Sequence, residues 1–172
     1  MDLEPQRFNA WEDLQKYTYR VASSVGLVCL PLFGADPKRA HDYAIALGDA
    51  LQLTNILRDI GEDLDNDLRI YVPLDDLVRF DYSEEDLLGR VHDARFLEFM
   101  NYQAKRCEEL YARATSLLPQ EDYKALLAPR VMHRIYHTLL GKMKKDNFRV
   151  FDRRYRLNKL QKLALLTKES FS

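Results

Sequence analysis

The feature that most constrains the fold of this chain is a narrow polar stripe on an otherwise apolar segment, between residues 52 and 63. The polar residues recur at intervals of three, four and four positions. At about 100° per residue in an α-helix, their side chains fall within roughly 80° of one another. Leucine, isoleucine and threonine fill most of the other positions. The pattern predicts the end of a helix whose polar residues share one face and line a cavity: Gln52, Asn55, Asp59 and Asp63.

The stripe carries the oxygen ligands that a hard divalent cation prefers. The carboxylates of Asp59 and Asp63 and the amide oxygen of Asn55 lie on successive turns. They can share one Mg²⁺ ion, which keeps several waters for a phosphate partner. Arg58 offers a planar donor fork for phosphate oxygens. A solvated, charged helix end is the alternative; the apolar neighbours argue against it, because a half-buried charge must be paired or bound to a metal.

The composition fits one globular, helical domain. The chain has 172 residues, of which 47% are hydrophobic and 31% charged, enough for one substantial core. Six glycines and six prolines suit an all-α fold, and a net charge of −1 gives no reason to expect a nucleic-acid partner. Cys29 and Cys107 make no disulfide framework, and no apolar run reaches the roughly 18–20 residues that span a bilayer. We therefore expect a cytoplasmic protein.

Helical periodicity of apolar residues covers most of the chain. Capping patterns indicate several helix starts: Asn9 with Glu12, Asp36 with Pro37, and Ser83 with Asp86. Proline is expected to end helices at positions 31 and 119 and to kink one at position 129. The sequence predicts helices over residues 11–30, 37–63, 93–118, 121–145 and 157–168, short helices starting near residues 75 and 83, and no strand.

Two histidines lie at a spacing that zinc sites use. His133 and His137 are four positions apart and would share a helix face. No third ligand is nearby in the sequence, and Arg134 would repel a cation. We expect a helix-face pair rather than a zinc site.

Two long motifs resemble those of a known family. Residues 52–63, Gln-Leu-Thr-Asn-Ile-Leu-Arg-Asp-Ile-Gly-Glu-Asp, followed by Arg-Ile-Tyr-Val-Pro at 69–73, resemble the second aspartate-rich motif of the squalene/phytoene synthases. Residues 17–26, Tyr-Thr-Tyr-Arg-Val-Ala-Ser-Ser-Val-Gly, are similar to that family's Tyr-x-x-x-Val-Ala-x-x-Val-Gly motif. The resemblance runs from about residue 1 to about residue 168.

The resemblance implies an all-α, isoprenoid-synthase-type array of helices around a central cavity. The family's first aspartate-rich motif has no counterpart in the sequence. We therefore expect residues 1–172 to form a single domain that corresponds to the C-terminal portion of a synthase, with the N-terminal helices missing, and to be inactive alone.

The family joins two prenyl diphosphates head to head, and farnesyl diphosphate is the expected substrate here. By resemblance, Asp59, Asp63 and Asn55 would hold Mg²⁺, or Mn²⁺ in its place. Arg58 would bind diphosphate, and Tyr17 would steady an allylic cation. The other residues implied to bind substrate are Gln52, Arg69, Tyr71, Val21, Val25, Gly26 and Tyr136. The C-terminal pattern is closest to bacterial hopanoid-pathway members, which make presqualene diphosphate or squalene; NADPH would be needed only for squalene.

Two alternatives remain open. Residues 142–168 carry ten Lys or Arg and two Asp or Glu, which indicates either a solvated basic face or peripheral contact with anionic lipid at the inner membrane. The chain could also be a non-catalytic binding or assembly protein on the same fold. The intact stripe argues against this second class, and the missing first motif argues for it.

Overall fold

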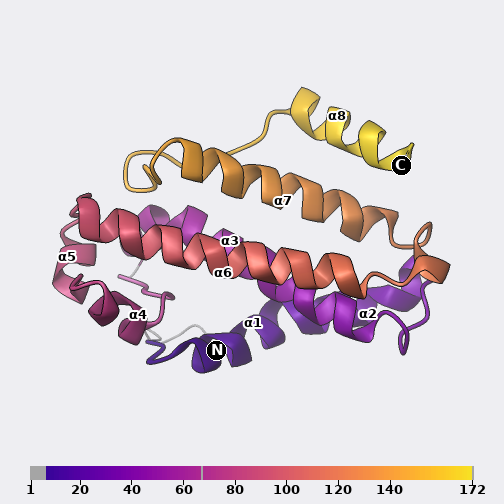
Figure 1. Cartoon of the computed structure of the whole chain (residues 1–172), viewed down its shortest axis with the longest axis horizontal. Helices are drawn as coiled ribbons and strands as arrows, with labels where there is room; N and C mark the ends of the chain where they lie inside the picture. The colour runs from indigo at the N-terminus through magenta and orange to yellow at the C-terminus, as the bar shows by residue number, and fades with distance from the viewer. Residues whose placement is uncertain (1–6, 67, 172) are drawn as a thin grey trace.

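The fold is an assembly of α-helices around one central helix (Figure 1). The computed structural model describes residues 7–66 and 68–171. All regular elements within these residues are helical, which confirms the predicted all-α class: α1 (Trp11–Thr18), the π-helical turn η1 (Tyr19–Ser23), α2 (Ser24–Phe33), α3 (His41–Asp65), α4 (Leu74–Arg79), α5 (Glu84–Leu88), α6 (Ala94–Leu117), the 3₁₀ turn η2 (Gln120–Asp122), α7 (Leu127–Lys145) and α8 (Lys159–Ser170).

Helix α3 lies at the centre of the hydrophobic core. It packs against η1, α2, α6 and α7, and α8 packs on α7. Figure 1 shows α7 on one side of α3 and the α1–α2 segment on the other. The apolar neighbours of the stripe, such as Leu53, Leu57 and Ile60, are buried. Thr54 joins α3 to α6 through a 2.8 Å hydrogen bond between its hydroxyl and that of Tyr111. Burial of these positions turns the polar stripe toward the space between helices. Within the described ranges, none of the helices combines the length and apolar character needed to cross a membrane.

The first long helical segment differs from prediction at both ends. Ala10, not Asn9, precedes α1, and no side chain caps it, so the predicted capping box with Glu12 is wrong. Pro31 does not end α2, which continues to Phe33. Pro31 lies on the exposed side of the helix, where the loss of one N–H is tolerated more easily than in the core. The helix ends instead at Gly34, whose φ of +81° suits a residue without Cβ.

Two other predicted starts are also displaced. Asp36 caps a separate turn by accepting from the Lys38 N–H at 2.8 Å, and α3 begins only at His41. Helix α7 begins at Leu127 rather than near residue 121, after η2. Pro129 is therefore in the first turn of α7, where backbone N–H groups have no intrahelical partner, and no kink is required. The predicted capping box of Ser83 with Asp86 is confirmed.

A buried carboxylate braces the π-helical turn against α3. Asp49 is 2% exposed and accepts from the Thr18 hydroxyl at 2.7 Å, the Ser23 hydroxyl at 3.2 Å and the Gln15 amide at 3.1 Å. Gly48 lies beside Ser23 so closely that a Cβ there would come within 2.6 Å of its hydroxyl oxygen. The missing side chain at residue 48 thus permits the crossing, and Asp49 fixes it.

Candidate active site

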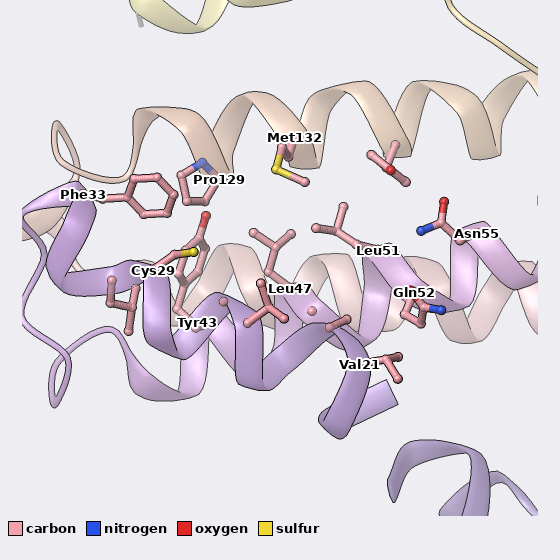
Figure 2. Close-up of a pocket in the computed structure, with 17 residues that line it drawn as sticks. Val21, Cys29, Phe33, Tyr43, Leu47, Leu51, Gln52, Asn55, Pro129 and Met132 are labelled. Atoms are coloured by element: carbon pink, nitrogen blue, oxygen red, sulfur yellow. The ribbon is translucent and has the colours of Figure 1, made fainter. Parts of the chain in front are cut away.

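The polar stripe starts in a cavity between α2, α3 and α7 (Figure 2). The cavity has a volume of about 250 Å³ and mostly apolar walls. Gln52 and Asn55 lie at one end of it, near Val21. Small residues of α2 leave space for the cavity, and the π-helical turn η1 places Val21 at the edge of the cavity. Six of the residues predicted to bind substrate line this cavity: Gln52, Asn55, Val21, Val25, Gly26 and Tyr136.

The amide oxygen of Asn55 is a buried acceptor without a donor. Its Oδ1 makes no hydrogen bond to any described residue. An unsatisfied buried acceptor costs roughly 1–3 kcal/mol, and such exceptions call for an explanation. A cation or a hydrogen-bond donor of a ligand would satisfy it.

Asp59 is clamped between two arginines. Arg58 grips it with two hydrogen bonds, Nε to Oδ1 at 2.8 Å and Nη2 to Oδ2 at 2.5 Å. Arg154, from the connection between α7 and α8, contacts the same carboxylate at 2.9 Å and Glu62 at 2.8 Å. Planar guanidinium groups match carboxylates in this geometry. The sequence did not indicate the pairing of Arg154 with Asp59 and Glu62, because no local pattern links residues 95 and 92 positions apart.

Asp63 lies farther along α3 and is short of positive charge. Burial, together with the negative charges of Asp59 and Glu62, raises its pKa to about 6, and the positive charges of Arg69 and Arg154 limit that rise. A carboxylate in such surroundings favours either a proton or a cation. Asp63 lines a small gap together with Arg69 and Tyr71, not the apolar cavity.

The donor set suits a hard divalent cation, although its geometry is incomplete. The carboxylates of Asp59 and Asp63 and the unsatisfied oxygen of Asn55 are the ligand types that Mg²⁺ takes. Among the described residues, no three His, Cys, Asp or Glu side chains converge well enough to hold a metal. Among the described residues, His133 and His137 likewise have no third side chain that would complete a metal site. The His133 ring stacks on that of Tyr111, with 4.7 Å between the ring centroids.

Tyr17 lies in an aromatic cluster outside the cavity. Its ring centroid is 5.3 Å from that of Phe8 and 5.4 Å from that of Tyr71. Tyr71 comes from the segment that follows α3, so the cluster ties the start of the chain to the end of the motif. The structure thus brings Tyr17 beside Tyr71 and does not place it among the cavity-lining residues.

A basic cleft of about 240 Å³ adjoins both the arginine clamp and the cavity. It shares Arg58 with the clamp and Tyr136 with the cavity. The pKa of Arg58 is raised, chiefly by its hydrogen bond to Asp59 and in smaller part by Tyr136. Four cationic side chains face this cleft, which suits an anionic group such as a phosphate: Arg58, Arg154, Arg156 and Lys162. Three of them belong to the basic segment that the sequence indicated only as a surface.

Fold and site together define an all-α protein with an apolar cavity that leads to carboxylates and a basic cleft. The chain matches the family model of squalene/phytoene synthase over residues 1–161. It is 37% identical to the 15-cis-phytoene synthase of Synechococcus elongatus over 178 aligned residues, which cover 96% of this chain and 58% of the relative. For the 15-cis-phytoene synthase of a Synechocystis strain the identity is 36%, over 96% of this chain and 52% of the relative.

Solved structures agree with these sequence relatives. A dehydrosqualene synthase in complex with a ligand aligns with a TM-score of 0.82 at 30% identity, over 96% of this chain and 58% of that one. A squalene synthase from Alicyclobacillus acidocaldarius aligns with a TM-score of 0.76 at 26% identity, over 86% of this chain and 56% of that one. The chain belongs to the squalene/phytoene synthase family and has its isoprenoid-synthase-type fold. It spans about half the length of the curated relatives it matches.

Proposed function

We propose that this chain supplies part of the active site of a prenyl transferase that condenses two prenyl diphosphates head to head. The observation that carries the proposal is the continuity of three environments along α3: an apolar cavity, the carboxylates of Asp59 and Asp63, and a basic cleft. A prenyl diphosphate has the same sequence of parts, a hydrocarbon tail and a charged head. Farnesyl diphosphate is the substrate we propose, with a presqualene-, squalene- or phytoene-type product.

In the reaction, the carbon–oxygen bond of one substrate breaks and its electron pair leaves with the diphosphate. The double bond of the second substrate attacks the allylic cation, and loss of a proton closes a cyclopropane ring. Arg58 and the other cations of the cleft would stabilise the departing diphosphate. The apolar cavity would exclude water that would otherwise quench the cation. We propose Tyr17 as a cation-stabilising ring, and Arg69 and Tyr71, of which Tyr71 contacts Tyr17, as substrate-binding residues at the mouth of the site.

The family uses a divalent metal ion for diphosphate ionisation. We propose Mg²⁺, with Mn²⁺ as a substitute, held by Asp59, Asp63 and Asn55 and oriented by Gln52. When bound, it would neutralise diphosphate charge and so weaken the bond to the leaving group. NADPH would enter only if the product were squalene.

Binding is the sharper test for the 172-residue chain. We expect no turnover from it alone, because its described residues supply one incomplete set of metal ligands. Calorimetry would compare farnesyl thiodiphosphate, which ionises poorly, with and without Mg²⁺. We expect Mg²⁺ to tighten binding at least tenfold, and Asp59→Asn or Asp63→Asn to remove that gain without lowering the melting temperature appreciably.

Asp75→Asn provides the matched control, because Asp75 is an exposed acid on α4. It should keep the full Mg²⁺ effect. If Mg²⁺ changed nothing, and farnesol bound as tightly as the diphosphate, the chain would be a non-catalytic binding protein on the same fold instead.

We also propose a cytoplasmic location with peripheral contact at the inner membrane through α8. Leu160 and Leu163 on the outer face of α8 and Phe171 directly after the helix are 76%, 59% and 88% exposed. The only acid of α8, Glu169, is turned inward and paired with Arg130 and Arg134. The outer face is therefore apolar and cationic, which suits anionic lipid.

Vesicle sedimentation tests this contact. The chain should bind vesicles with anionic lipid and not neutral ones, and Leu160→Glu should abolish binding. Binding to neither kind, with self-association through α8 instead, would overturn the membrane assignment.

A further inference from the structure

One polar group lies at the apolar end of the cavity. Tyr43 of α3 is 2% exposed, and its hydroxyl makes no hydrogen bond to a described residue. Figure 2 shows its oxygen directed toward Pro129, at the end of the cavity opposite Gln52 and Asn55. A buried hydroxyl without a partner is costly, so this position requires an explanation that packing alone does not give.

The hydroxyl is placed to meet the far end of a long ligand. Tyr43, Leu47 and Leu51 line the cavity from successive turns of one face of α3. From Asn55 back to Tyr43, α3 rises about 18 Å at 1.5 Å per residue. Phe33 and Pro129 line the cavity at the same end as Tyr43. A molecule whose head lies near Asn55 and whose tail fills the cavity would therefore bring its terminal group to Tyr43.

We propose that Tyr43 is a specificity-determining residue that recognises the unsaturated end of a prenyl tail, its hydroxyl donating to the π electrons of the terminal double bond. Donation to a π system is a weak hydrogen bond. A saturated tail end would leave the same hydroxyl with no acceptor. The site would therefore bind a saturated tail more weakly than an unsaturated one, because the Tyr43 hydroxyl would stay unpaired. The proposal deepens the proposed function and rests on it for the prenyl nature of the ligand and for the direction in which the tail enters.

Prenyl alcohols test the tail contact without diphosphate or metal. Calorimetry would compare farnesol with the dihydrofarnesol whose terminal double bond is reduced. The natural chain should bind farnesol about two- to fivefold more tightly, the range expected of one weak hydrogen bond. Tyr43→Phe should bind both alcohols equally, and should bind dihydrofarnesol more tightly than the natural chain does, because no hydroxyl is left unsatisfied.

Tyr123→Phe is the matched control. Tyr123 sits under Arg130 near the start of α7 and outside the cavity, and phenylalanine keeps that ring contact. This variant should retain the natural preference for farnesol. Should Tyr43→Phe fold poorly, Tyr43→Met also removes the hydroxyl and fills the space with a flexible apolar chain.

Two outcomes would overturn the inference. If Tyr43→Phe still preferred farnesol to the same extent, the Tyr43 hydroxyl would not be the group that recognises the terminal double bond. Failure of the natural chain to bind farnesol would mean that the tail does not occupy this cavity. Both are independent of the Mg²⁺-dependent binding of farnesyl thiodiphosphate, so a failure here and a failure of the proposed function can be told apart.

Discussion

The polar side chains of the two halves of α3 are held in different ways. From Tyr43 to Asn55 the helix is fixed by packing and by hydrogen bonds from uncharged donors. From Arg58 to Asp63 the polar side chains form ion pairs at partly exposed positions, while Gly61 on the same stretch also packs closely against the backbone of Val150. The first half borders the apolar cavity, and the second borders the basic cleft.

In the first half, α3 makes close contacts with η1 and hydrogen bonds with α1 and η1. Gly48 meets the backbone of Ser23, and Asp49 takes hydrogen bonds from Thr18, Ser23 and Gln15. In the second half, Asp59 is shared between two arginines and Asp63 has too little positive charge around it. Packed contacts of the first kind keep the shape of a cavity. Ion pairs of the second kind can exchange partners, as a site that takes up and releases charged groups must.

The largest expected effect tests the packed half. Gly48→Ala would place a Cβ within 2.7 Å of the Cα of Ser23, so two backbones would have to separate. We expect a loss of about 2–3 kcal/mol in the free energy of unfolding, measured by urea denaturation. Gly141→Ala on α7 is the control. A Cβ there meets nothing within 4 Å, so this variant should gain up to about 1 kcal/mol from helix propensity. Equal effects in the two variants would show that the crossing at residue 48 is not tight.

The packed half was largely predictable from the sequence, and the ionic half was not. Helical periodicity predicts the buried positions around the stripe. It also predicts that Gln52 and Asn55 lie on the face that borders the cavity. Ser83 and Asp86 form the predicted cap because that signal is local. The pairing of Asp59 with Arg154 depends on how the chain returns from α7, which no local pattern encodes.

Proline shows a second limit of sequence-based prediction. Pro31 and Pro129 were expected to end and to kink helices. Their effect depends on whether the missing N–H had a partner, and that depends on helix boundaries. Pro31 is on an exposed face and Pro129 in a first turn, so both are accommodated.

Acidification should change the stability contributions of two groups in opposite directions: His133 of α7, near the first half of α3, and Asp63 in the second half. Burial lowers the pKa of His133, which stacks on Tyr111 behind the packed half, to about 4. Unfolding lets His133 bind a proton between pH 6.5 and 4, so its contribution to stability falls as the pH falls through that window. Asp63, with a pKa raised to about 6, binds its proton more tightly when folded, so its contribution rises as the pH falls from 6 to 4.

Single variants should separate these opposed contributions. Without Mg²⁺, Asp63→Asn should lose stability on acidification by about 1–2 kcal/mol more than the natural chain between pH 7 and 4, and His133→Phe should lose about that much less. Phenylalanine keeps the ring stacked on Tyr111. Urea denaturation at several pH values measures both. Parallel pH profiles for the natural chain and both variants would contradict the assignment.

The smallest expected effect tests whether the ionic half exchanges partners. Arg154→Gln removes a guanidinium from Asp59 and Glu62 while leaving Arg58 in place. Since Arg154 is 37% exposed, stability should change by less than about 1 kcal/mol. Mg²⁺ alone should bind about three- to tenfold more tightly, because a positive charge that competes for the same carboxylates is gone. Inorganic diphosphate without Mg²⁺ should bind more weakly, because the cleft has lost one of its cations. Arg149→Gln is the control, because Arg149 pairs with the exposed Asp152 rather than with Asp59 or Glu62; it should change neither affinity. The test depends on the two affinities changing in opposite directions. If Mg²⁺ and diphosphate both bound more weakly, Arg154 would only stabilise the structure and would not exchange between the carboxylates and a bound anion.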